Sequence, residues 1–421
     1  MPEVRVTHLR ISRRGLAGLA ALVLLPWVFV LWLARERSTS PSPVLKSTPA
    51  ATAAAPAPAP GSGWVALAPG PWGNLQSTRI VIEPPEDYVP TGYIKPDALR
   101  WIFKGYSPAT LDALWQRAGL STAQRQVLAE ATKVERGAIA IDPSPEFIIG
   151  LTPQARATIY VALAEFPENH SQNEPYRLRA DAATEWFAES GLSPEILDLT
   201  KRLLYERNGN VFFADDDVVL PRIASTTERV QFIKTLSRKS TQLVQLVVGP
   251  DTSAEAIARY WGRGRRSKDI EPLIQSLVRK PGGGAIDIVH LVPRFPRSLL
   301  YTYPLASEKP EDAAHDCHWA AFNFFNDIPD ERFANIDFVR ETLLNRYYPV
   351  AGAPTFGDLV VLVRADGTVV HSCVYLAADV VFTKNGAAYS VPWMLGNLDS
   401  IVAFYSISSP VEVRRYRLKN L

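Results

Sequence analysis

The chain has 421 residues, of which 47% are hydrophobic and 10% aromatic, and its formal net charge is +2. This composition is typical of an ordinary globular protein, so it excludes a wholly disordered chain and gives no sign of a nucleic-acid partner. Its 34 prolines are the one unusual feature.

Residues 15–34 form an uncharged apolar run. As a helix, twenty such residues reach about 30 Å, the thickness of a bilayer's hydrocarbon core. Four arginines precede the run and only Arg35 and Arg37 follow it closely, which places the N-terminus in the cytoplasm. A cleaved signal peptide is the alternative, but Trp32-Leu33-Ala34 is not a small-x-small cleavage site. The sequence therefore predicts a basic cytoplasmic segment over 1–14 and a single-pass membrane anchor over 15–34.

Residues 35–62 are rich in Ala, Pro and Ser and end in AATAAAPAPAPGS. A segment of this composition cannot bury a core, so we expect a partly extended spacer. On this topology the rest of the chain lies outside the cytoplasm, in the periplasm, where a disulfide is permitted.

Residues 63–284 are predicted to form a mainly helical domain, because Ser or Thr followed by Pro recurs as a helix start. Ser121 and Gln124 have the spacing of a capping box. We expect an all-α middle domain with its own core. Its basic loop Arg263-Gly264-Arg265-Arg266 is interpreted as solvated, with an anionic glycan or phospholipid headgroup as the alternative ligand.

Residues 285–421 are predicted to form a second, α+β domain. Residues 317–326 indicate a helix. Strands are expected over 356–363, 369–376, 380–383, 401–405 and 411–418, with Asp-Gly and Asn-Gly turns that are typical of antiparallel hairpins.

The candidate chemistry lies in two clusters of this domain, His315-Asp316-Cys317-His318 and His371-Ser372-Cys373. Asp316 can cap the helix, which leaves Cys317 in the first turn, where unpaired N–H groups and the helix dipole favour a thiolate. Such surroundings lower a cysteine pKa at reactive sites. Cys317 is therefore the candidate nucleophile.

Strand alternation puts His371, Cys373 and Tyr375 on one face. If that face packs on the helix, His371 can reach Cys317 and act as its base. The group that orients the histidine is expected on the next strand, at Lys384 in the first place, with Thr383 or Asn385 as alternatives.

These motifs resemble the NlpC family of papain-like cell-wall cysteine peptidases. The resemblance rests on Asp316-Cys317, on the Gly-Asp-Leu-Val motif of residues 357–360, on residues 371–376 and on the polar residue about a dozen positions after His371. It implies a papain-like fold over about 300–421, a cysteine hydrolase acting through an acyl-enzyme, and peptidoglycan stem peptides as substrate. By the same resemblance, Tyr303 would lie near the oxyanion.

Other interpretations stay open. Cys317, His318, His371 and Cys373 are the ligand types of a zinc site, although adjacent residues on a helix diverge by about 100°. Cys317 and Cys373 could instead form a disulfide. The chain could also be a non-catalytic envelope protein that binds a partner. We expect no metal and no cofactor.

Overall fold

A computed structural model describes residues 63–421 except 86–88, 90–91, 93, 136, 180–182, 305–314, 389–390 and 407–408. The predicted cytoplasmic segment, anchor and spacer, residues 1–62, lie outside the described residues. Among those that are described, no helix combines the length and apolar character that a bilayer crossing requires. The transmembrane part of the predicted fold class therefore has no counterpart among the described residues.

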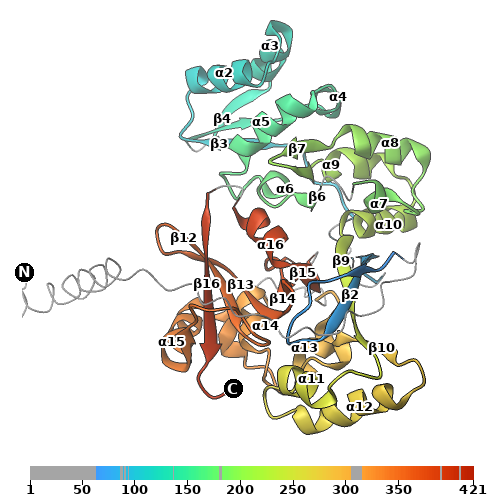
Figure 1. Ribbon diagram of the computed structural model, residues 1–421. Helices are drawn as coiled ribbons and strands as arrows, with labels where there is room; N and C mark the ends of the chain where they lie inside the picture. The colour runs from blue at the N-terminus through green and yellow to red at the C-terminus, as the bar shows by residue number, and fades with distance from the viewer. Residues whose placement is uncertain are drawn as a thin grey trace, which may run out of the picture. The chain divides into compact units, whose positions relative to one another are not determined.

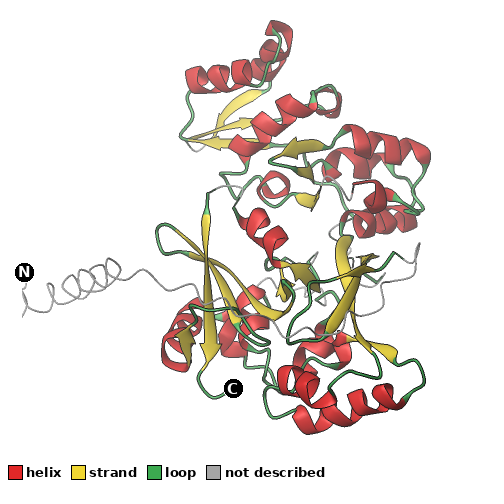
Figure 2. Cartoon of the chain, viewed as in Figure 1, coloured by secondary structure: helices red, strands yellow, loops and turns green. Residues whose placement is uncertain are grey.

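The region predicted to be all-α is a mixture of helices and antiparallel sheets, so that prediction was wrong (Figures 1 and 2). Two three-stranded sheets lie within it: β3 (Trp101–Lys104), β5 (Ala138–Ile141) and β4 (Thr132–Glu135), then β6 (Tyr176–Arg179), β8 (Asn210–Phe213) and β7 (Tyr205–Arg207). A third sheet has the order β1 (Val65–Ala66), β2 (Asn74–Ile82), β9 (Lys239–Val248) and β10 (Gly284–Asp287). The physical reason is that most of these strands are only three or four residues long, too short to show a period of two.

The predicted helix starts of this region are confirmed. Ser107 and Ser121 each cap a helix with a reciprocal capping box, and Thr152 accepts a hydrogen bond from the main-chain N–H of Ala155. The helices here are α2 (Pro108–Arg117), α3 (Thr122–Glu130), α4 (Pro145–Ile149), α5 (Pro153–Leu163), α6 (His170–Asn173), α7 (Ala183–Phe187), α8 (Pro194–Arg202), α9 (Asp216–Val219) and α10 (Thr226–Leu236).

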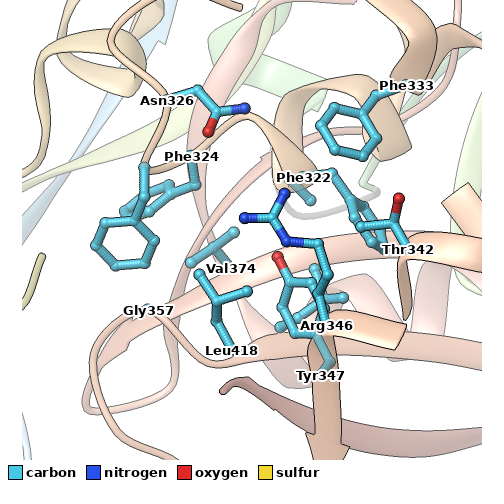
Figure 3. Close-up of a pocket in the computed structure, with 13 residues that line it drawn as sticks. Phe322, Phe324, Asn326, Phe333, Thr342, Arg346, Tyr347, Gly357, Val374 and Leu418 are labelled. Atoms are coloured by element: carbon cyan, nitrogen blue, oxygen red, sulfur yellow. The ribbon is translucent and has the colours of Figure 1, made fainter. Parts of the chain in front are cut away.

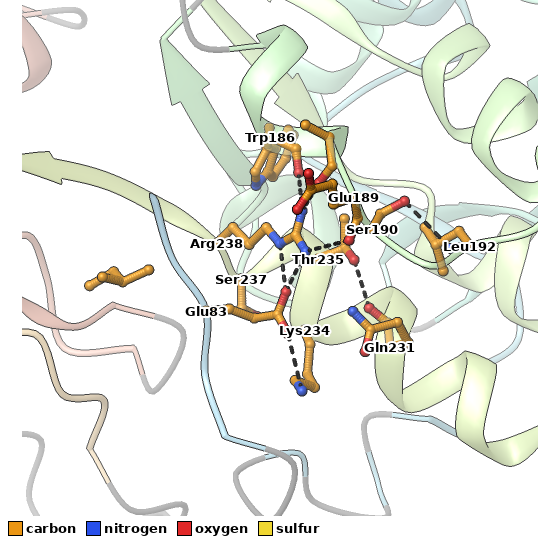
Figure 4. A network of polar contacts seen from close by, with 12 residues as sticks. Glu83, Trp186, Glu189, Ser190, Leu192, Gln231, Lys234, Thr235, Ser237 and Arg238 are labelled. Atoms are coloured by element: carbon orange, nitrogen blue, oxygen red, sulfur yellow. Dashed lines mark hydrogen bonds and ion pairs between the residues drawn. The ribbon is translucent and has the colours of Figure 1, made fainter. Parts of the chain in front are cut away.

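An ion-pair network joins the end of β2 to α10 (Figure 4). The carboxylate of Glu83 lies 3.1 Å from Nζ of Lys234 and accepts a 2.6 Å hydrogen bond from Nε of Arg238. The Arg238 guanidinium also donates to the carbonyls of Trp186, Ala188 and Glu189. Burial acts to raise the pKa of Glu83, but the contacts with the two cations together outweigh it and lower that pKa. The network therefore holds the segment after β2 against the C-terminal end of α10 and the residues that follow α7.

A six-stranded antiparallel sheet forms the C-terminal part. Its order is β11 (Tyr347–Pro349), β16 (Val411–Leu418), β12 (Leu359–Arg364), β13 (Val369–Ala377), β14 (Val380–Lys384) and β15 (Trp393–Asn397). The helices that precede or accompany it are α11 (Ala254–Trp261), α12 (Ser267–Arg279), α13 (Arg294–Leu299), α14 (Cys317–Phe322), α15 (Ile336–Arg346) and α16 (Leu398–Tyr405). The antiparallel hairpins predicted between β12, β13 and β14 are confirmed.

The strand predicted over 401–405 was wrong, because these residues belong to α16. The side chain of Asn397 caps this helix by accepting from the N–H groups of Asp399 and Ser400. Leu398, Ile401 and Tyr405 then recur at helical spacing. These residues also have strand propensity. The N-cap and the helical spacing together favour a helix more strongly.

Two apolar clusters make up most of the core. The first contains residues from β3, β5, α2, α5 and α10. The second contains α14 and one face of the six-stranded sheet, together with Leu75 of β2, Val244 of β9 and Trp261 of α11. The sheet that carries the candidate residues therefore packs with segments that lie much earlier in the sequence.

Gly357, in the Gly-Asp-Leu-Val motif before β12, has a φ of +85°. A Cβ atom there would lie 2.4 Å from Cζ of Phe325. Both the backbone conformation and the close approach require glycine. The next residue, Asp358, is completely buried and pairs with Arg417.

Candidate functional site

Cys317 is the first residue of α14, as the sequence predicts. Asp316 is the N-cap residue, and its Oδ1 accepts a 2.9 Å hydrogen bond from the N–H of Trp319. The cysteine is 5% exposed, and the main-chain N–H of Ser372 lies close enough to Sγ to act to lower the pKa of the thiol. The nucleophile candidate therefore lies near the residue that follows His371 in β13.

The face of β13 that packs on α14 is the one opposite to the face expected. Val374 and Leu376 share the second core cluster with α14, whereas Cys373 and Tyr375 pack with α16. The reason is the amount of apolar surface: the Val374 face continues into a broad layer with Leu359, Val361 and Phe382. His371 belongs to the face covered by the short helix α16.

His371 is completely buried and is held from two sides. Its ring stacks on Tyr405 of α16, with ring centroids 4.4 Å apart. Its Nε2 lies 3.0 Å from Oγ1 of Thr383, and that hydroxyl donates to Oδ1 of Asn385. The orienting residue is thus Thr383, with Asn385 behind it, and Lys384 does not make this bond.

This chain of hydrogen bonds fixes the tautomer of His371. Because the Thr383 hydroxyl gives its proton to Asn385, its oxygen must accept the proton on Nε2 of the imidazole. Nδ1 then carries a lone pair, and it is a buried atom without a hydrogen-bond partner. This free acceptor lies on the face of β13 that α16 covers, whereas Cys317 belongs to α14 on the other face, and the structure shows no hydrogen bond between the two side chains.

Lys384 lies on the other face of β14, toward α14. It is buried, and its Nζ donates to the carbonyls of Gly386 and Ala388 at 2.7 and 3.1 Å. Burial lowers the pKa of Lys384 to about 8, and the nearby Cys317 and Asp316 oppose that change. Its positive charge in turn favours the thiolate of Cys317.

Both members of the candidate pair are neutral in this arrangement. Burial raises the pKa of the Cys317 thiol to about 12 and lowers the pKa of the His371 imidazole to about 3. The cause is desolvation, which penalises every charged form. Burial therefore favours a neutral thiol and a neutral imidazole over a thiolate–imidazolium pair.

A second imidazole lies beside the cysteine. Nδ1 of His318 is 2.9 Å from Oγ of Ser372, and potential ligand atoms of Asp316, Cys317 and His318 lie within 4.8 Å of one another. Among the described residues this is the one group with metal-site spacing. It differs from the Cys₂His₂ set considered above, and one Asp316 oxygen already caps α14. Burial lowers the pKa of His318, which keeps it neutral.

The remaining predicted residues lie elsewhere. Oη of Tyr303 donates to the carbonyls of Ser237 and Ile82 at 2.8 and 3.1 Å, so it joins the β2 and β9 region and does not face Cys317. His315 stacks on Trp319 and contacts Glu331. Cys317 and Cys373 are both free thiols, so the structure contains no disulfide between them.

The far end of α14 borders a small cavity of about 20 Å³, room for about one water molecule (Figure 3). Its wall is largely aromatic, with Phe322, Phe324 and Phe333, while Arg346 and Asn326 supply the polar edge. Cys317 and His371 are not among its lining residues. It is too small for a substrate.

Sequence reasoning assigns no role to Ser372 and Tyr405, and it gives His318 only as a candidate zinc ligand. Period-two alternation places the side chains of Ser372 and His371 on opposite faces of β13. Alternation does not describe the main chain, and the main-chain N–H of Ser372 is the group near Sγ of Cys317. Tyr405 escapes notice because its segment has strand propensity. The helical spacing of apolar residues after Asn397 is the sequence signal that would have identified Tyr405.

Comparison of the chain with protein-family models, with curated proteins and with solved structures gave no match.

Proposed function

We propose that the chain is a cysteine hydrolase that cleaves an amide bond, with Cys317 as nucleophile and His371 as base. The proposal is supported by the place of Cys317 at the start of α14 near Lys384, and by the unpartnered Nδ1 of His371, which Thr383 and Asn385 hold as an acceptor on the other face of β13. The helix N-terminus and Lys384 both favour the negative sulfur.

In the proposed reaction, Sγ attacks the carbonyl carbon while Nδ1 of His371 takes the thiol proton. The C–N bond then breaks, and the imidazolium gives its proton to the leaving amine. A water molecule, deprotonated by His371, attacks the thioester and restores the thiol. Because Cys317 and His371 lie on different faces of β13, this proton transfer requires a local rearrangement that brings Sγ and Nδ1 together when substrate binds.

The substrate class follows from the resemblance alone. The NlpC-like motifs favour peptidoglycan stem peptides, and a location outside the cytoplasm would give access to them. The competing proposal is a non-catalytic envelope protein in which this part only supports a binding function.

The test is digestion of purified peptidoglycan by the full-length protein, followed by chromatography of the released fragments. Cys317→Ala is expected to abolish release, whereas Cys373→Ala retains it. Since one general base contributes about 10²- to 10⁴-fold, His371→Gln should lose that much activity and His318→Gln much less. Equal activity of Cys317→Ala and the parent would overturn the nucleophile assignment.

A substrate-independent control separates the enzyme from the non-catalytic alternative. In the reduced protein, iodoacetamide should modify Cys317 faster than Cys373, because only Cys317 lies at a helix N-terminus beside a lysine. Equal, slow labelling of both cysteines together with no fragment release would favour the non-catalytic protein.

A further inference from the structure

An arginine-lined cleft lies away from Cys317. It has a volume of about 520 Å³, within the range of small-molecule sites, and Arg259 and Tyr260 of α11, Arg263 and Arg417 line it. Pro71 adds an apolar wall, and the Tyr260 hydroxyl is engaged with the carbonyl of Leu376, so its ring remains for packing. These residues come from distant parts of the chain, brought together by the second core cluster.

Two of the guanidinium groups are held in place from below by Asp358. This carboxylate is completely buried and accepts hydrogen bonds from Nε and Nη2 of Arg417 at 2.7 and 2.8 Å. It also accepts from the N–H of Thr355, and its Oδ1 lies 3.9 Å from Nη1 of Arg263. Arg263 is further fixed by the carbonyl of Phe356, at 3.2 Å. The two cations are therefore positioned before any ligand arrives.

The third guanidinium is free to adjust. Arg259 is 75% exposed and pairs only with Glu255, one turn earlier on the same helix. Exposed pairs of this kind contribute little to helix stability, so a ligand can draw Arg259 away at little cost. It is the adjustable arm of an otherwise fixed site.

The charges of the cleft are unbalanced. Three arginines line it, and the carboxylates of Asp358 and Glu255 offset two of them, which leaves a local charge of about +1. Arg263 and Arg417 also repel each other. A bound anion would offset the excess charge and the repulsion between Arg263 and Arg417, and guanidinium forks match phosphate oxygens.

We propose that this cleft binds a phosphate group, carried by a phosphorylated small molecule or by a phospholipid headgroup, with the adjoining part of the ligand packed on Tyr260 and Pro71. The site is independent of the proposed hydrolase activity. It assigns a role to part of the basic loop 263–266, in which Arg266 instead holds the carbonyls of Leu291 and Val292.

The test is calorimetric titration of the full-length protein with glucose 6-phosphate and with inorganic phosphate, and sedimentation with phosphatidylglycerol vesicles. Glucuronate and pure phosphatidylcholine vesicles serve as controls for a carboxylate and for an uncharged surface. Arg259→Gln, which touches no buried group, and Arg263→Gln should each weaken binding about tenfold, as expected for the loss of one charge-assisted hydrogen bond. Arg340→Gln, an exposed helical arginine elsewhere that pairs with Asp337, is the matched control.

Saturable binding of glucose 6-phosphate that responds to these variants supports a soluble ligand, and binding confined to phosphatidylglycerol assigns the headgroup. Binding that is the same in Arg259→Gln, Arg263→Gln and the parent, or no binding to either phosphate source, overturns the proposal. Cys317→Ala should bind as the parent does, so failure here is distinguishable from failure of the proposed hydrolase.

Discussion

The ring of Tyr405 lies flat against the imidazole of His371, with the two planes inclined by only 22°. Tyr405 comes from α16, whose neighbouring Phe404 is engaged by Arg177 of β6, through its carbonyl at 2.8 Å and its ring at 3.3 Å. The proposed base is thus covered by a helix that a distant strand holds in place.

Replacing Tyr405 by a smaller side chain is expected to open the region around His371 and Cys317 to solvent. Since an aromatic pair contributes about 0.5–1.5 kcal/mol beyond its buried area, Tyr405→Leu should raise the rate of Cys317 alkylation by iodoacetamide about 2- to 10-fold. Tyr405→Phe keeps the stacked ring and should label as the parent does. A slower rate in Tyr405→Leu would show that α16 does not limit access.

The hydrogen bond from His371 to Thr383 is expected to matter for turnover. Thr383→Val keeps the shape but removes the acceptor, so Nε2 is left unsatisfied and the imidazolium loses its support. A hydrogen bond to a charged group is worth about 1.5–3 kcal/mol, which corresponds to a roughly 10- to 100-fold lower kcat. Thr383→Ser should remain close to the parent in a steady-state assay of fragment release, and equal rates for Thr383→Val and Thr383→Ser would remove Thr383 from the mechanism.

Burial of neutral His371 makes the fold sensitive to acid. Its folded pKa of about 3 lies below the ordinary value of 6.5, so the unfolded chain binds a proton first as the pH falls. The stability it contributes is present above pH 6.5 and is lost toward pH 3. Between pH 6.5 and 5 this amounts to about 2 kcal/mol. Urea unfolding at both pH values should show that His371→Gln loses correspondingly less stability than the parent.

Lys384 is expected to set the reactivity of Cys317. Removing its positive charge in Lys384→Met takes away an interaction that lowers the thiol pKa, so the pH profile of alkylation should move to higher pH. Circular dichroism of the same samples checks that the fold is retained. An unchanged profile in a folded variant contradicts the electrostatic role.

Gly357 is expected to tolerate no side chain. Alanine would meet Phe325 and would be strained at a φ of +85°, so Gly357→Ala should destabilise the protein by about 2 kcal/mol or more, measured by urea unfolding. Gly367→Ala, which has a similar φ but open space around it, isolates the steric part.

The sequence predicted what local rules control. Asp316 is predictable as the cap of α14 because an aspartate directly before a helical apolar run is a preferred N-cap residue. The strands β12, β13, β14 and β16 are predictable from alternation and turn residues. It could not predict which face of β13 meets α14, since both faces are apolar and only the packing of Val361 and Phe382 decides. The identity of the orienting residue depended on the turn at Ala378 and Asp379 and on the irregular register next to it.

Thr241 of β9 donates a 2.8 Å hydrogen bond to the carbonyl of Leu395 in β15, inside the core cluster that begins at Leu75. The stability of the C-terminal sheet therefore depends on strands that come much earlier in the sequence. An excised fragment from residue 285 onward would leave this interface uncovered and is expected to aggregate, whereas supplying residues 63–284 as a separate polypeptide should rescue its solubility. The part of the chain with Cys317 and His371 is thus expected to depend on residues 63–284 for its folding, and not to fold as an independent domain.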